Sequence, residues 1–385
     1  MNLLYTDKEN AYREELRAFL NQELAPIAAH IEETDEVPFD FMRKLGAKGY
    51  MGILHSKKYG GNELGLIYDH IVSEEICYHS AAVDIIRAQS TLYFASPISR
   101  WGTEKQKTEI LPGIIRAEKF GSIAITEPRG GSDAAYMTTR ADTEGDGFVL
   151  NGEKTWITNA GFADFLCVFA ITDTDAHPHQ GMTAFLVRTN NPGFKILRKI
   201  ETMGVRGGSH CHIQFENCVI PGDDVIGEVN RGWEVLTDEL ASERVDIASR
   251  GLGCARRAFE EAVRYTAHRE QFRKKIREFE GVSFKIADMK VALEAMRLLI
   301  IRAARQFDEG QPTENEAAIA KLFASEASFR IADDAMQVHG AYGYSKDAEV
   351  EKIFRDTRVY GFGGGTSEIM RYLIQREVYK EFDLL

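Results

Sequence analysis

The chain has 385 residues, 44% of them hydrophobic, and a formal net charge of −12. This length allows two or three packed units with a full core, and the negative charge argues against nucleic acid or an anionic membrane surface as the main partner. Five scattered cysteines without a CxxC pair indicate reduced thiols in a cytoplasm-like compartment and no zinc site. We see neither a secretory signal nor the roughly 18 consecutive apolar residues of a membrane span, so the expected location is cytoplasmic.

Helical periodicity marks the first part of the chain, for example residues 9–24, 39–45 and 104–115. Between residues 120 and 230 the pattern changes to short β-rich runs separated by NG, DG, PG and GG turn signals, which predicts a sheet. Long helical periods then return. The sequence therefore predicts an α+β fold with domains at residues 1–119, 120–230 and 231–385, and a ligand site between these units.

Two motifs border the predicted sheet. IAITEPRGGSD, residues 123–133, contains a glycine turn whose N–H groups can approach an anion or a ring edge, although a plain tight turn is the commoner explanation. NGEKTWITNAG, residues 151–161, places Trp156 in a short strand, either as a ligand contact or as a core side chain. The histidine pairs 177/179 and 210/212 lack a third ligand in the sequence, so we predict no metal site.

Several motifs in register point to one family. TEPRGGSD, NGEKTWITNAG, HREQF, QVHGAYGY and GGGTSEIMR follow the order and spacing of acyl-CoA dehydrogenases, which the chain resembles from about residue 7 to 378. The resemblance implies a helical N-terminal domain, a central β-barrel-like domain and a C-terminal four-helix bundle. It also implies FAD as cofactor, a homotetramer or homodimer, an acyl-CoA substrate and an electron-transferring flavoprotein as redox partner.

The resemblance assigns cofactor contacts residue by residue. Ser132 is expected at the flavin phosphate or the CoA arm, and Arg269 at the FAD of a neighbouring subunit, where its planar fork suits a pyrophosphate. A solvated charge near a helix end is the alternative for Arg269, and Thr366 with Glu368 also matches a helix cap. The implied cofactor contacts are Ile123, Ala124, Ile125, Thr126, Ser132, Trp156, Thr158, Arg269, Phe272, Gln337, His339, Gly340, Ala341, Thr366 and Glu368.

The implied catalytic base departs from the commonest family pattern. Many members carry the catalytic Glu at the position of Gly364, which has no side chain and cannot accept a proton. In isovaleryl-type and long-chain-type members the base lies instead on the first C-terminal helix in an L-x-x-E-R pattern, and LASER places Glu243 there. A second departure is Glu280, where relatives usually have a Gln that helps to hold the neighbouring flavin.

The surroundings of Glu243 support this assignment without the resemblance. On a 3.6-residue period Glu243 shares an apolar stripe with Leu240 and Ile247. The other residues three or four positions away are Glu239 and Asp246, so its own helix offers no basic partner. An apolar environment raises the pKa of a carboxyl group, which suits removal of a carbon-bound proton near neutral pH. A salt bridge to another part of the bundle is the alternative.

The predicted reaction is α,β-dehydrogenation, in which Glu243 takes the α-proton and the β-hydrogen leaves as hydride to the flavin, giving a trans-2-enoyl-CoA. Relatives stabilise the thioester oxygen with the backbone N–H at the position of Gly364. The expected substrate contacts are Ser132, Asp84, Arg244, Gly364 and Gly365. For Arg244 a structural salt bridge is an equal alternative.

Asp84 interrupts an apolar helical run and argues against a dicarboxylic acyl group. It either meets a polar or cationic acyl tail, acts as a second acid or base, or forms a salt bridge to Arg87, the most frequent of these arrangements. Three alternatives to the dehydrogenase remain: an enoyl-CoA reductase running the reverse reaction, an oxygen-using relative, and a non-catalytic flavin-binding or CoA-binding homologue.

Overall fold

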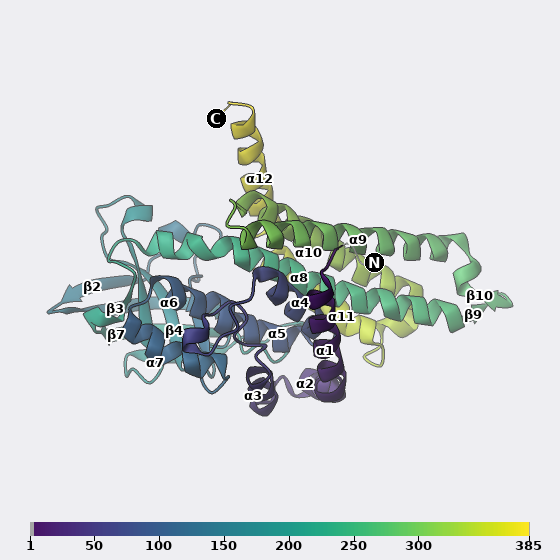
Figure 1. The fold of residues 1–385 in the computed structure, drawn as a ribbon, viewed down its shortest axis with the longest axis horizontal. Helices are drawn as coiled ribbons and strands as arrows, with labels where there is room; N and C mark the ends of the chain where they lie inside the picture. Colours follow the sequence, from purple (N-terminus) through teal and green to yellow (C-terminus); the bar gives the residue numbers. More distant parts are fainter. Residues whose placement is uncertain (1–3, 385) are drawn as a thin grey trace.

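The computed structural model of the protein describes residues 4–384. Figure 1 shows an elongated molecule with the sheet at one end and long helices that run to the opposite end. Helices come first, strands follow and helices close the chain, so the predicted order of the α+β fold is confirmed. Within the described residues, no helix is both long enough and apolar enough to cross a membrane.

The N-terminal region is helical. Its helices are α1 (Asp7–Glu23), α2 (Ala28–Thr34), α3 (Phe39–Ala47), α4 (Leu66–Cys77), α5 (Ala81–Ala88), α6 (Ala95–Trp101) and α7 (Glu104–Ile115). A capping box starts α1, because the Thr6 hydroxyl accepts from the Glu9 N–H while the Glu9 carboxylate accepts from the Thr6 N–H. Between α5 and α6, residues Gln89–Phe94 form a π-helical turn, a local widening often found near functional sites.

The central region is one sheet. Its strands are β1 (Gly121–Ala124), β2 (Arg140–Glu144), β3 (Gly147–Ile157), β4 (Phe165–Ile171), β5 (Met182–Arg188), β6 (Phe194–Lys199), β7 (Cys211–Ile220) and β8 (Val225–Ile226). The strand path is β6-β7-β3-β2-β4-β5-β8, and β1 pairs in parallel with β4. At Gly121 a Cβ atom would lie 2.0 Å from Cδ1 of Phe94. Only glycine therefore lets β1 approach the π-helical turn this closely.

The C-terminal region is built on three long helices. Its elements are α8 (Gly232–His268), β9 (Glu270–Gln271), β10 (Lys274–Lys275), α9 (Glu280–Asp308), α10 (Glu314–His339), α11 (Glu349–Thr357) and α12 (Ser367–Glu381). α8 packs on α4, α9 and α10, and a Cβ atom at Gly253 would lie 2.4 Å from the Glu74 carbonyl oxygen of α4. In Figure 1, α12 projects away from the body of the molecule.

Candidate active site

The two positions that carry the base in different family members meet in this structure. A Cβ atom at Gly364 would lie 3.1 Å from Oε1 of Glu243 and 2.1 Å from Cδ1 of Ile247. Gly364 and Gly365 have φ angles of 61° and 93°, a left-handed conformation that residues with side chains rarely adopt. Glu243 of α8 and Ile247 therefore fill the space into which a side chain at position 364 would project.

Glu243 is partly buried and keeps a free carboxylate. Within residues 4–384 it forms no hydrogen bond and no ion pair, so the salt bridge left open by the sequence is absent from the described structure. Burial raises the pKa of Glu243, Arg244 and Arg250 oppose the rise, and Asp246 adds to it. A carboxylate with a raised pKa and no fixed partner has the properties of a general base.

Asp84 belongs to a buried ion network behind this site. The guanidinium of Arg87 donates to Asp84 Oδ1 and to Asp69 Oδ1, each at 2.6 Å, and lies 3.6 Å from Asp246 Oδ1. Arg250 pairs with Asp246 and lies 3.6 Å from Asp84 Oδ2. Asp84 is fully buried, so the Arg87 pairing suggested by the sequence is present, while a contact of Asp84 with a substrate stays a prediction.

Arg244 is buried next to the base. Its Nε has no hydrogen-bond partner among the described residues, and burial lowers the pKa of the guanidinium, against the effect of Glu243. No salt bridge to Arg244 is found in residues 4–384. The structural salt bridge that the sequence allowed as an alternative to a substrate contact is therefore absent from the described structure. An unpaired donor of this kind suits a polar ligand group.

A first group of predicted cofactor residues lies at the sheet. Ile123 and Ala124 end β1, and the Thr126 carbonyl accepts from the Thr155 N–H of β3 at 2.9 Å. Trp156 has a φ of 62° and is 57% exposed, so it is no core side chain in this chain. The Thr158 hydroxyl lies 3.0 Å from Nδ1 of His210, and Ser132 is exposed in the glycine turn.

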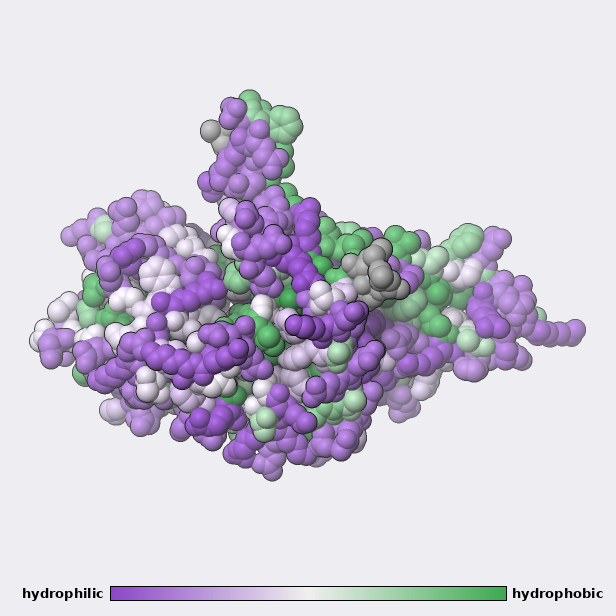
Figure 2. Space-filling model, in the orientation of Figure 1, coloured by the Kyte–Doolittle hydropathy of each residue, from purple (hydrophilic) through white to green (hydrophobic). Residues whose placement is uncertain are grey.

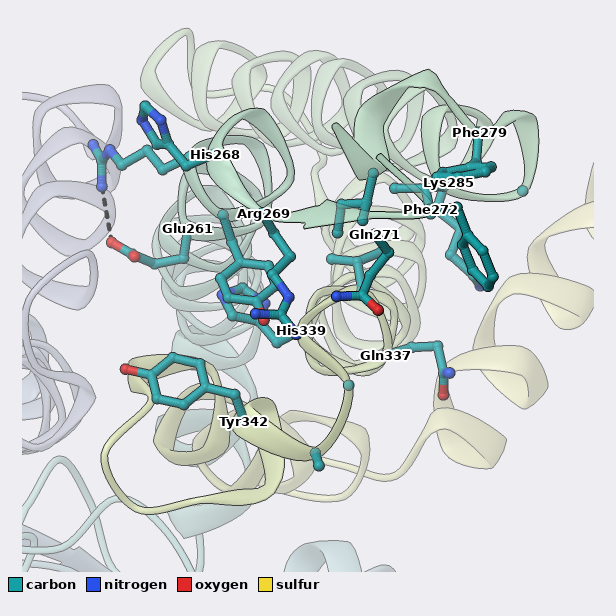
Figure 3. A pocket seen from close by; sticks show the side chains of 18 residues that line it. Glu261, His268, Arg269, Gln271, Phe272, Phe279, Lys285, Gln337, His339 and Tyr342 are labelled. Carbon is teal, nitrogen blue, oxygen red and sulfur yellow. Dashed lines mark hydrogen bonds and ion pairs between the residues drawn. The ribbon is translucent and has the colours of Figure 1, made fainter. Parts of the chain in front are cut away.

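The second group lies at the opposite end of the molecule. A hollow of about 1200 Å³ lies at the tip of the bundle. Figure 3 shows its lining, where Arg269 and Gln271 follow α8 and His339 ends α10. Its lining includes the predicted cofactor residues Arg269, Phe272, Gln337, His339, Gly340 and Ala341. The side chain of Arg269 forms no hydrogen bond or ion pair within the described chain. An unpaired arginine in an open hollow suits an anionic group.

Family models match almost the whole chain. The N-terminal, middle and C-terminal domain models of the acyl-CoA dehydrogenases match residues 6–118, 122–218 and 230–379. The chain belongs to the acyl-CoA dehydrogenase family. It is therefore an oxidoreductase of a flavoprotein family.

Named relatives cover nearly the full length of this acyl-CoA dehydrogenase-family chain. A 3-(aryl)acrylate reductase from Clostridium sporogenes is 36% identical over 98% of this chain and 100% of its own. An acyl-CoA dehydrogenase from Bacillus subtilis is 38% identical, over 96% and 98%. The structure of butyryl-CoA dehydrogenase from Megasphaera elsdenii is 32% identical with a TM-score of 0.94, covering 98% of this chain and 100% of that one.

FAD is the cofactor of this family. The FAD complex of PigA matches this chain with a TM-score of 0.94 and 26% identity, covering 98% of this chain and 99% of that chain. The residues present fit such a group in two respects: the exposed indole of Trp156 offers a ring surface, and the hollow at Arg269 offers an unpaired cation.

The sequence interpretation missed residues at the hollow and at the proposed base. Tyr265 lines the hollow and stacks on His339 with ring centroids 4.2 Å apart, and its place one helical turn before HREQF was the available signal. Lys321 was missed at the base. It is fully buried on α10 and donates a hydrogen bond to the carbonyl oxygen of Gly365. The signal was a lone cation in a run of alanines.

Proposed function

We propose that this protein dehydrogenates an acyl-CoA thioester to a trans-2-enoyl-CoA, with Glu243 as the base, and that its electrons pass to an electron-transferring flavoprotein. The observation that carries this proposal is the free carboxylate of Glu243 beside Gly364. That carboxylate replaces the one that other family members carry at position 364. A homologue without catalysis would have no reason to keep an unpaired, partly buried acid there.

The residues of this chain have distinct roles in the proposed reaction. Glu243 takes the α-proton onto a carboxylate oxygen. The Gly364 N–H has no acceptor within residues 4–384, so it is free to donate to the thioester oxygen as negative charge develops there. Bound FAD supplies the hydride acceptor. Arg244, with its unpaired Nε, is proposed to hold a polar part of the substrate.

Anaerobic bleaching of the flavin tests the proposed function. Straight, branched, cyclic and dicarboxylic acyl-CoAs are mixed with the holoenzyme, and absorbance is followed. We expect at least one thioester to bleach the flavin, and the best one identifies the acyl group. If no thioester reduces it, the proposal fails; an enoyl-CoA that reoxidises the reduced enzyme would then favour the reductase, and inertness in both directions a non-catalytic homologue.

A reductase is the second candidate, because the Clostridium sporogenes relative is an acrylate reductase. The same base and the same oxyanion donor serve both directions, since each direction passes through the same transition state. The electron partner therefore decides between the two. Faster turnover with an oxidised electron-transferring flavoprotein and an acyl-CoA than in the reverse assay supports the dehydrogenase.

The pH dependence of activity follows from the environment of the base. Glu243 acts only when ionised, and burial raises its pKa above the ordinary 4.5. Activity is therefore expected to fall as the pH drops through this raised pKa and to be retained above it. The measurement is kcat/KM of the holoenzyme from about pH 5 to about pH 9. A profile without an acid limb in this range would contradict the raised pKa.

We propose that the enzyme works as a homotetramer or homodimer. In Figure 1, β3 and β9 lie at opposite ends of the molecule, and Trp156 belongs to β3 while Arg269 directly precedes β9. A cofactor that touches both residues therefore needs a second copy of the chain. Figure 2 shows hydrophobic side chains along the bundle and on one side of α12. On α9, Phe284, Val291 and Leu298 are 61%, 69% and 52% exposed and lie seven residues apart, a stripe typical of helix pairing.

Replacing Arg269 tests the cofactor assignment. Arg269→Met is expected to weaken FAD retention roughly tenfold, since a charge-assisted hydrogen bond is lost. Flavin absorbance per protein after dialysis measures retention, and light scattering measures the assembly. The matched control is Arg264→Met, because Arg264 lines the same hollow but already pairs with Glu260 and Glu261. Equal flavin loss in both variants would show that Arg269 has no specific role.

A further inference from the structure

Lys321 places an ammonium group in the interior of the protein beside the proposed base. It lies on α10, its side chain is fully buried, and its Nζ donates to the carbonyl oxygen of Gly365. No carboxylate of residues 4–384 forms an ion pair with it. A buried charge with one backbone acceptor is costly, so a specific contribution of this hydrogen bond is expected.

The hydrogen bond fastens a turn that has little other support. Gly364 and Gly365 are both left-handed, and glycine has more backbone freedom than any other residue. On one side of the turn the Gly363 N–H donates to the Val359 carbonyl at 2.8 Å. On the other side the Thr366 hydroxyl caps α12. Between these two contacts, Lys321 binds the carbonyl oxygen of Gly365. Gly365 directly follows Gly364, the proposed oxyanion donor.

The charges around this lysine connect it to the base. The charges of Glu243 and Arg244 on α8 and of Glu368 on α12 act electrostatically on Lys321. Burial lowers the pKa of Lys321 to about 8, while Glu243 opposes that shift. In return, the ammonium group is one of the charges that lower the pKa of Glu243. The charged and titratable groups that face Glu243 are Arg244, Arg250, Asp246, Lys321, Tyr93 and Glu239.

We propose that Lys321 is a positioning residue whose ammonium group clamps the Gly364–Gly365 turn against α8, so that the Gly364 N–H and the Glu243 carboxylate face the same substrate carbon and its thioester oxygen. This inference rests on the proposed function for its catalytic part. Its structural part, the clamping of the turn, holds whatever the substrate is.

The test compares Lys321→Met with wild-type holoenzyme. Hydrogen exchange of residues 363–369 is expected to become faster while exchange in α4 stays the same. The kcat is expected to fall about 10²-fold because reacting groups lose their alignment, with the Kd of a non-reacting acyl-CoA changed less than about threefold. The acid limb of the kcat/KM profile is expected at higher pH, because a cation that lowered the pKa of Glu243 is gone.

The matched control is Lys105→Met on α7, which also removes one lysine but from an exposed ion pair with Asp223, outside the proposed catalytic and cofactor sites. It should change none of these quantities. The proposal is overturned if Lys321→Met leaves exchange at residues 363–369 unchanged, or if exchange rises equally throughout the chain.

If Lys321→Met does not fold, Lys321→Arg decides. This variant keeps the cation but displaces it. Faster hydrogen exchange limited to the turn, with the acid limb of the kcat/KM profile unmoved, supports the clamp. Unaltered hydrogen exchange at the turn overturns it. Failure of the dehydrogenase proposal is seen separately, as wild-type flavin that no thioester bleaches. The exchange comparison needs no substrate and still tests the clamp in that case.

Discussion

Glu243→Gln is expected to bind acyl-CoA and FAD normally and to reduce the flavin about 10³-fold more slowly than the wild type, because an amide cannot accept the α-proton. Glutamine keeps the shape of the side chain, so the contacts with Ile247 and Gly364 remain. Anaerobic stopped-flow absorbance measures the rate, and titration with a non-reacting thioester measures binding.

Glu239→Gln is the matched control. Glu239 lies one helical turn earlier on α8 and is also buried, which raises its pKa to about 8. Its Oε1 lies 3.6 Å from Nε of Arg100. We expect this variant to keep a rate within a few-fold of wild type. If both variants lose activity to the same degree, the loss reflects disturbance of α8, and Glu243 has no special role as the base.

Arg87→Met is expected to destabilise the protein by about 3–5 kcal/mol, the usual consequence of removing one member of a buried ion network. Arg87 is fully buried and compensates Asp69, Asp84 and Asp246. Methionine fills much of the volume but leaves these carboxylates without their shared cation. The shift of the thermal unfolding midpoint against wild type measures the effect.

The pH dependence of this loss has a definite sign. Burial already raises the pKa of Asp69 to about 6, and Arg87 opposes that rise. Without the arginine the folded-state pKa rises further above the unfolded value, so ionised Asp69 disfavours folding. The destabilisation should therefore be larger at pH 8 than at pH 5, where the carboxyl is protonated. Arg43→Met, at an exposed pair with Asp40, should cost at most about 1 kcal/mol at either pH.

The sequence was sufficient for the order of the elements, because strong periodicity is a local property. The period over residues 233–269 corresponds to α8 at Gly232–His268, and the run around Trp156 lies in β3. The π-helical turn at Gln89–Phe94 was missed because all six of its residues are buried, so no polar face marks the change of phase. The projection of α12 was missed for another reason: it depends on packing that no local pattern encodes.

The candidate site was only partly readable from the sequence. The motif order implied both Glu243 and Gly364, but their contact joins residues far apart in the chain, and only the fold shows that they lie together. The partners of Arg87 come from α4, α5 and α8, so local spacing revealed only Asp84. Lys321 was overlooked because a single lysine in a helix usually marks the solvated face.

Exchange of the substrate α-proton tests the central claim most directly. A saturated acyl-CoA is incubated anaerobically in D₂O with the flavin-loaded wild type and with Glu243→Gln, and deuterium at the α-carbon is measured by mass spectrometry. The account predicts α-deuteration by the wild type and none above the uncatalysed level by the variant. Equal α-deuteration by both proteins would show that another group removes the proton and would contradict the assignment of Glu243.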